Sequence, residues 1–72
     1  MQTLPDNYKK NIEILQINLD RGMSATQANQ AIDSMYNQFK RANLLDDTAQ
    51  NYINAMREQV IEHFTNITVN VA

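Results

Sequence analysis

Hydrophobic residues recur along this chain at the spacing of an α-helix in three separate segments. Within each segment, neighbouring apolar positions are three or four residues apart, so they share one helix face. The three stripes are Tyr8, Ile12, Leu15 and Leu19; Ala28, Ile32, Met35, Phe39 and Ala42; and Ala49, Ile53, Met56, Val60 and Phe64. The pattern predicts three amphipathic helices over residues 4–20, 25–42 and 47–64.

Capping signals support these boundaries. Ser24 and Gln27 have the spacing of a capping box, and Thr3 and Asp6 repeat it with Asp in place of the usual Glu or Gln. Gly22 suits the left-handed residue that follows a helix. The candidate caps of the third helix are Asp46 and Asp47. Residues 11–19 are rich in Ile and could also form a strand, but the cap, the stripe and the glycine favour a helix.

The C-terminal residues change their period. Apolar and polar residues alternate from Thr65 to Val71, which places Ile67, Val69 and Val71 on one face of an extended strand. This strand has no partner within the chain, so we expect it to add to another chain's sheet or to pair with its own copy. The predicted fold is a single all-α domain: a small three-helix bundle with a short extended tail over residues 66–72.

The first helix carries more apolar surface than a bundle covers. At about 100° per residue, Ile14 and Ile17 lie roughly 140–200° from Ile12, on the opposite side of the helix. Either the first helix is buried on two sides within its own fold, or Ile14 and Ile17 meet another chain. We therefore predict that both residues bind a partner.

Composition limits the kinds of catalytic and metal-binding site that the chain can form. Six Lys and Arg face eight Asp and Glu, and no Cys is present for a disulfide or a thiolate zinc site. His63 is the sole histidine, with no Asp, Glu or His three or four residues away, so it reads as a surface residue near a helix C-terminus. Gly22 is the sole glycine, which excludes a glycine-rich phosphate loop. We expect no enzyme activity, no metal, no cofactor and no small-molecule substrate.

The sequence also predicts where the protein is located and what charge its partner carries. The first residues lack a basic start and an apolar run, and apolar runs are too short to span a bilayer, so we expect a cytoplasmic protein without membrane contact. Glu58 and Glu62 lie four residues apart on an acidic third helix. We predict that they face a basic partner and speed the encounter.

These features favour a small non-catalytic regulatory or adaptor protein that binds another protein chain or its own copy as a homodimer. Small size and seventeen Asn and Gln residues fit a phage or mobile-element accessory protein, such as an inhibitor of a DNA-binding regulator. Two alternatives stay open. One is a structural subunit that folds as a homo-oligomer. The other is a DNA-binding transcriptional regulator, because the segment around Gly22 resembles a helix-turn-helix, although Asn18, Arg21 and Ala28 depart from its pattern.

Overall fold

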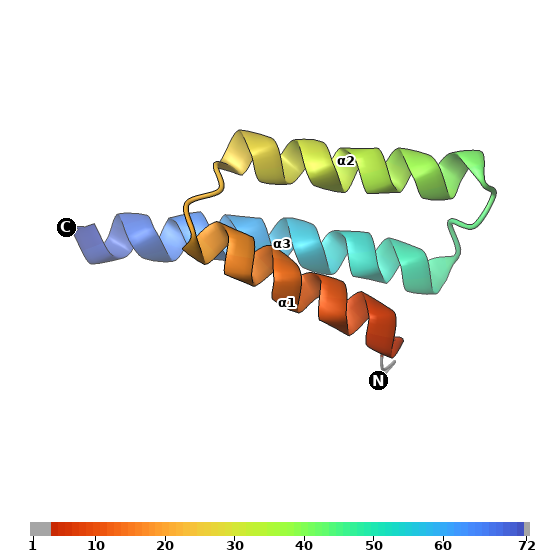
Figure 1. Cartoon of the computed structure of the whole chain (residues 1–72), viewed down its shortest axis with the longest axis horizontal. Helices are drawn as coiled ribbons and strands as arrows, with labels where there is room; N and C mark the ends of the chain where they lie inside the picture. The colour runs from red at the N-terminus through yellow and green to blue at the C-terminus, as the bar shows by residue number, and fades with distance from the viewer. Residues whose placement is uncertain (1–3, 72) are drawn as a thin grey trace.

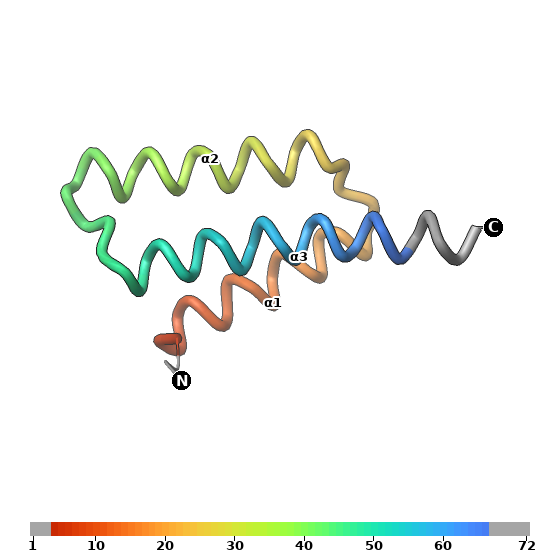
Figure 2. Tube along the Cα trace, turned by 180° about the vertical axis from the view of Figure 1, so that it is seen from behind, coloured from red at the N-terminus to blue at the C-terminus, as the bar shows by residue number. Residues whose placement is uncertain are grey.

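The computed structural model describes residues 4–71, with side chains described as far as Asn66. It contains three α-helices: α1 (Asp6–Asp20), α2 (Ala25–Arg41) and α3 (Asp47–Val71). Figures 1 and 2 show α2 running antiparallel to both other helices, so α1 and α3 run in the same direction. The described residues include no strand. The predicted all-α, three-helix architecture is confirmed.

The starts of α2 and α3 follow the predicted caps. The Gln27 backbone N–H donates to Ser24 Oγ at 3.1 Å, and the Ser24 N–H donates to Gln27 Oε1 at 3.2 Å. At α3, the cap is Asp46, whose Oδ1 accepts from the Ala49 N–H at 2.8 Å. Each of these bonds satisfies an N–H group that has no partner within its helix.

The start of α1 differs from the prediction. Its N-cap residue is Pro5, which makes no side-chain capping hydrogen bond. The helix therefore begins at Asp6, and Thr3 lies outside the described residues. A proline at this point places no constraint on the helix, because its missing N–H would have had no intrahelical partner.

Left-handed residues end both α1 and α2. Gly22 has φ +109° and Asn43 has φ +60°. In each case the left-handed residue and the next one donate their N–H groups to carbonyls of the last helical turn. The bonds are Gly22 to Leu19 (3.1 Å), Met23 to Asn18 (3.0 Å), Asn43 to Lys40 (3.2 Å) and Leu44 to Phe39 (2.8 Å). Both ends are Schellman motifs, so the connections leave the helices in defined directions.

Helix α3 is the centre of the packing. It contacts both α1 and α2, whereas α1 and α2 contact each other only weakly. Most predicted stripe residues are in the core or pack against it, and Ala42 is exposed. The buried residues are Leu15 and Leu19 of α1, Ala28 and Ile32 of α2, and Ala49, Tyr52, Ile53, Met56 and Val60 of α3. The bundle therefore contains two main helix–helix interfaces, which we call the α1–α3 seam and the α2–α3 seam.

The prediction of an extended C-terminal tail is wrong, because the backbone is helical as far as Val71. Helix α3 does not end near Phe64 but continues to Val71, past the connection between α1 and α2 in Figure 1. A lone strand would leave its backbone groups without protein partners, whereas a helix pairs them within the segment. β-branched residues oppose a helix by less than about 1 kcal/mol each, so their alternation does not prevent it. The side chains of Ile67, Val69 and Val71 lie outside the described residues.

Candidate partner-binding groove

A groove opens between α1 and α2, with α3 as its floor. It consists of two adjoining hollows, of about 430 Å³ where α2 passes into α3 and about 230 Å³ nearer the α1–α2 connection. Asn11 and Met35 line both hollows, so the two form one continuous feature. Residues that line this α1–α2 groove include Tyr8, Asn11 and Ile14 of α1, Ala31, Met35, Gln38 and Phe39 of α2, and Tyr52 and Met56 of α3.

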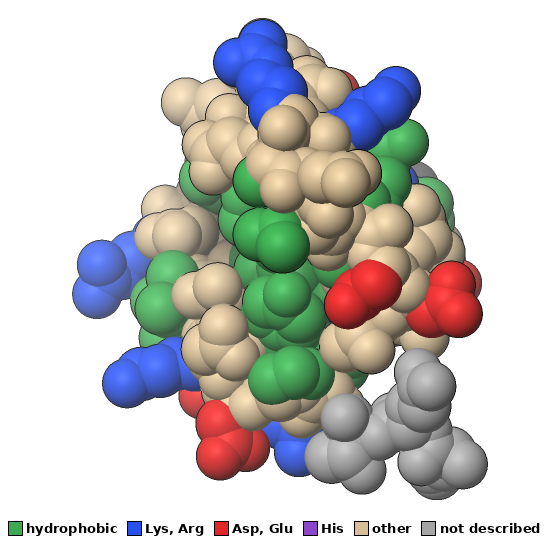
Figure 3. Space-filling model, turned by 90° about the vertical axis from the view of Figure 1, so that its right-hand side faces the viewer, with side chains coloured by type: hydrophobic (Ala, Val, Ile, Leu, Met, Phe, Trp, Pro, Cys, Tyr) green, Lys and Arg blue, Asp and Glu red, His purple; other side chains and the backbone are tan. Residues whose placement is uncertain are grey.

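The groove reaches the surface as an apolar strip. Figure 3 views the end of the molecule where α2 passes into α3, and hydrophobic side chains run down the middle of this face. Lys and Arg side chains border the strip at the top of the view, and acidic side chains lie to its right. Leu44, which lines the wider hollow, is exposed. Apolar surface bordered by polar groups is typical of a protein-binding site.

The sequence explains why α1 and α2 do not close over α3. The edge of α1 that borders the groove carries Asn7, Asn11 and Asn18, which share a face at helical spacing. The opposite edge of α2 is short or polar, with Ala31 and Gln38. Burying an amide without a hydrogen-bond partner costs about 1–3 kcal/mol. These polar and short side chains leave a hollow between the two helices. Ile14 and Leu44 are exposed at its edges, whereas the Tyr52 and Met56 side chains beneath it are buried.

Three aromatic rings hold the wider end of the groove in shape. Tyr8 of α1 stacks on Tyr52 of α3, with ring centroids 4.3 Å apart and planes 3° from parallel. Phe39 of α2 meets both rings edge-on, at 6.0 and 6.3 Å. Such pairs contribute about 0.5–1.5 kcal/mol each beyond their buried area. This cluster joins all three helices at the wider end of the groove.

Tyr52 has a pKa that is raised from its ordinary value. Burial raises the pKa above 10.0, a hydrogen bond with Asn11 lowers it in part, and the neighbouring Tyr8 raises it further. The hydroxyl also donates to Met35 Sδ at 3.5 Å. Tyr52 is therefore a neutral, buried part of the groove floor at physiological pH.

The two isoleucines predicted to bind a partner lie at the surface. Ile14 is 47 % exposed and Ile17 is 50 % exposed, so the bundle covers neither completely. Their positions differ, however, because Ile14 lines the narrower hollow and Ile17 lines neither hollow. The role of both residues in binding a partner stays a prediction. Ile14 lies at the edge of the groove, whereas Ile17 lies outside its lining.

The acidic residues predicted on α3 are not part of the groove. Glu58 and Glu62 are exposed and line neither hollow. Between them in sequence lies Ile61, which is 64 % exposed. Ile61 is not one of the predicted stripe residues of the third helix, and its exposure follows from the packing of α3.

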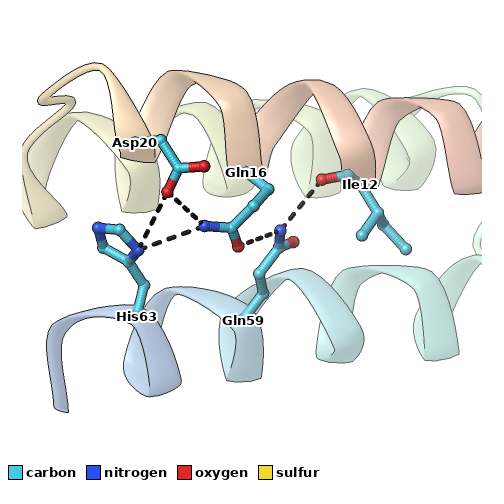
Figure 4. A network of polar contacts seen from close by, with 5 residues as sticks. All are labelled: Ile12, Gln16, Asp20, Gln59 and His63. Atoms are coloured by element: carbon cyan, nitrogen blue, oxygen red, sulfur yellow. Dashed lines mark hydrogen bonds and ion pairs between the residues drawn. The ribbon is translucent and has the colours of Figure 1, made fainter. Parts of the chain in front are cut away.

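On the other side of α1, a polar network joins α1 to α3 (Figure 4). Gln59 Nε2 donates to the Ile12 carbonyl at 3.0 Å and to Gln16 Oε1 at 3.1 Å. Gln16 Nε2 donates to Asp20 Oδ1 at 2.9 Å and lies 3.3 Å from His63 Nδ1. Gln59 Oε1 is buried without a hydrogen-bond partner. Buried unsatisfied acceptors cost free energy, so this seam is imperfectly satisfied.

His63 does not occupy the surface position that its sequence context indicated. Its side chain is 12 % exposed, between α1 and α3, with Nδ1 3.9 Å from Asp20 Oδ1. The difference arises from tertiary packing, because Gln16 and Asp20 of α1 lie against His63. Residues 12, 16 and 20 of α1 meet residues 59 and 63 of α3 because the two helices run in the same direction.

Other kinds of site find little support in the described residues. They contain no group of three His, Cys, Asp or Glu side chains placed to hold a metal ion. Over the same part of the chain, no helix combines the length and apolar character needed to cross a membrane. No protein-family model matches the chain, and the searches of curated proteins and of solved structures found no significant match. Within the part of the chain that the structure describes, the α1–α2 groove is therefore taken as the candidate site.

Proposed function

We propose that this protein is a small non-catalytic regulatory or adaptor protein that binds another protein through the α1–α2 groove. The observation that carries this proposal is a hollowed, largely apolar groove between α1 and α2, at whose edges Ile14 and Leu44 are exposed. An amphipathic helix of the partner that enters such a groove packs its apolar face against the facing sides of α1 and α2. The complex then resembles a four-helix arrangement in which the partner provides the missing helix.

Ile14 supports the same proposal. It stands half-exposed on the α1 side of the narrower hollow, where a bound helix would cover it. Burial of a large apolar side chain contributes about 1.5–3 kcal/mol. Binding through preformed apolar surface needs no catalytic group, and a protein of this kind acts by occupying a surface of its partner. Inhibition of a DNA-binding regulator is one form that such action takes.

The DNA-binding alternative has less support. A helix-turn-helix sets its two helices at about 90–120° to each other. Here α1 and α2 lie antiparallel with a groove between them. We therefore keep a protein partner as the proposal.

A peptide-display selection tests the groove with binders drawn from a random library. The immobilised full chain is used to select binders from a library of helical peptides, and their affinities are measured by fluorescence anisotropy. Ala31→Glu places a charged side chain in the narrower hollow from an exposed position, so it blocks the groove without disturbing the core. We expect it to weaken binding at least tenfold.

Asn37→Glu is the matched control. It adds the same side chain to the same helix at an exposed position that lines neither hollow. We expect unchanged affinity for this variant. Selected peptides that bind the Ala31→Glu protein as tightly as the original would refute the groove as the binding site.

A further inference from the structure

The exposed side of α1 next to the groove carries a second, charged feature. Lys10, Ile14, Ile17 and Arg21 follow one another at spacings of four, three and four residues. At 100° per residue they lie within about 60° of one another, so they form one stripe along the helix. We call it the basic α1 stripe: two isoleucines with a cation at each end.

We propose that the partner segment carries carboxylates on both sides of a short apolar centre, and that Lys10 and Arg21 bind those carboxylates. This inference rests on the proposed function and names the chemistry of its partner. The isoleucines provide the apolar contact, and the two cations determine which partners fit and in which register.

Both cations are available for a partner. Lys10 and Arg21 are exposed, and neither forms an ion pair with an acidic side chain among the described residues. Asp6 lies four residues before Lys10, a spacing at which helical side chains often pair, yet the two do not form an ion pair here. The two cations are eleven residues apart, or about 16 Å along the helix axis at 1.5 Å per residue.

The acidic residues of α1 lie beside the stripe, on the side away from the groove. Asp6, Glu13 and Asp20 repeat every seven residues, roughly 50–90° around the helix from the middle of the basic α1 stripe at 100° per residue. Asp20 accepts a hydrogen bond from Gln16 within the polar network. A partner that approaches from the groove side therefore meets the cations of the stripe before these carboxylates.

A second copy of this chain does not match the stripe. If two α1 helices paired antiparallel about Ile14 and Ile17, Lys10 of each would face Arg21 of the other, and like charges would repel. The acidic surface of α3 fits no better. Glu58 and Glu62 lie within about 6 Å along their helix, so they can reach one of the two cations but not both.

A protein fits the stripe better than nucleic acid does. DNA binding depends on cations clustered against a continuous row of phosphates. Here the two cations are separated by two half-exposed isoleucines, which would gain nothing against a phosphate backbone. A helix with an apolar centre and acidic ends satisfies both kinds of side chain at once.

The experiment uses the helical peptides selected on the immobilised full chain. Peptides bound to the original protein are sequenced, and their affinities are measured for the Lys10→Glu/Arg21→Glu double variant. Lys9→Glu/Arg41→Glu is the control, because it makes the same change of net charge at two exposed positions outside the stripe. Circular dichroism verifies that each variant keeps its helices. A 20-base-pair DNA duplex is tested in parallel.

We expect the selected peptides to carry Asp or Glu on both sides of an apolar pair. Their binding should weaken at least tenfold in Lys10→Glu/Arg21→Glu and less than threefold in the control, and a new selection on the charge-reversed protein should yield Lys and Arg at those positions. Peptides without acidic enrichment, or equal losses in both double variants, would overturn the inference. Binding to the duplex that requires Lys10 and Arg21 but not Ile14 and Ile17 would also overturn it.

The two proposals fail in different ways. Peptides that lose affinity for Ala31→Glu but not for Lys10→Glu/Arg21→Glu contradict the acidic partner and leave the groove in place. Peptides that are indifferent to Ala31→Glu contradict the groove itself, whatever their charge.

Discussion

The two seams of the bundle are built from different kinds of side chain. Against α3, helix α2 places Ala28 and Ile32, both fully buried. An ion pair between the exposed side chains of Asp33 and Arg57 also crosses this seam. Helix α1 also buries apolar residues, but its seam includes the polar network around Gln59, with one orphaned oxygen. Apolar burial stabilises by about 25 cal/mol per Å², whereas a neutral hydrogen bond contributes about 1 kcal/mol net.

This comparison shows which helix holds the fold and which one borders the site. Helices α2 and α3 form the better-packed pair, and α1 joins them through Leu15, Leu19 and the aromatic cluster. The proposed binding surface lies along α1, so the partner contacts the helix that is held less firmly. Regions that bind ligands are often drawn from the less stable part of a structure.

The largest expected effect is in the α2–α3 seam. Ile32→Ala removes a fully buried side chain and should cost about 2–5 kcal/mol of unfolding free energy. Ile12→Ala makes the same change in the α1–α3 seam, where the residue is half-buried, and should cost less. Urea unfolding followed by circular dichroism measures both. Equal losses would contradict the distinction between the seams.

A smaller effect is expected when the α1–α3 seam is made to resemble the other one. Gln16→Leu/Gln59→Leu removes both side-chain amides, including the orphaned Gln59 oxygen, and replaces them with apolar side chains. Because no amide group is left unpaired, we expect stability to rise by about 1 kcal/mol. Gln59→Ala alone should lower it, since it deletes two hydrogen bonds and packing. A double variant less stable than the original would show that the network holds α1 in place.

The smallest effect should appear only in alkaline solution. The pKa of Tyr52 is raised in the folded state, first by burial, so above pH 10 the unfolded chain loses the proton more readily than the native one. The contribution of Tyr52 to the free energy of unfolding should be fully present below pH 10. It should be lost as the pH rises through the folded-state pKa. Urea unfolding at pH 8, 10 and 11 measures this loss, which Tyr52→Phe should reduce and Tyr36→Phe should not. The same loss in all three proteins would assign it to other groups.

Much of the local structure follows from local rules. The Ser24–Gln27 box and the cap at Asp46 form between residues close in the chain, so the sequence alone indicates them. The glycine at the end of α1 was equally legible. Asn43 performs the same role at the end of α2, and the tolerance of asparagine for the left-handed region is a weaker signal of the same kind.

The sequence predicted only part of the candidate site. The exposure of Ile14 and Ile17 followed from the helical period, but that period says nothing of which neighbour each residue meets. Ile14 lines the groove because α1 leans away from α2, and this depends on amides of α1 and short residues of α2 acting together. The sequence misplaced His63 for a related reason, because its burial depends on the packing of α1 against α3.

The sequence by itself determined that this chain forms three amphipathic helices with defined ends, because helical period and capping act over a few residues. The tertiary structure decided which helices pack together, that α1 packs against α3 rather than α2, and that a groove remains between α1 and α2. Those outcomes depend on how side chains from three helices share one limited core. They arise from contacts between residues far apart in the chain, which no local pattern encodes.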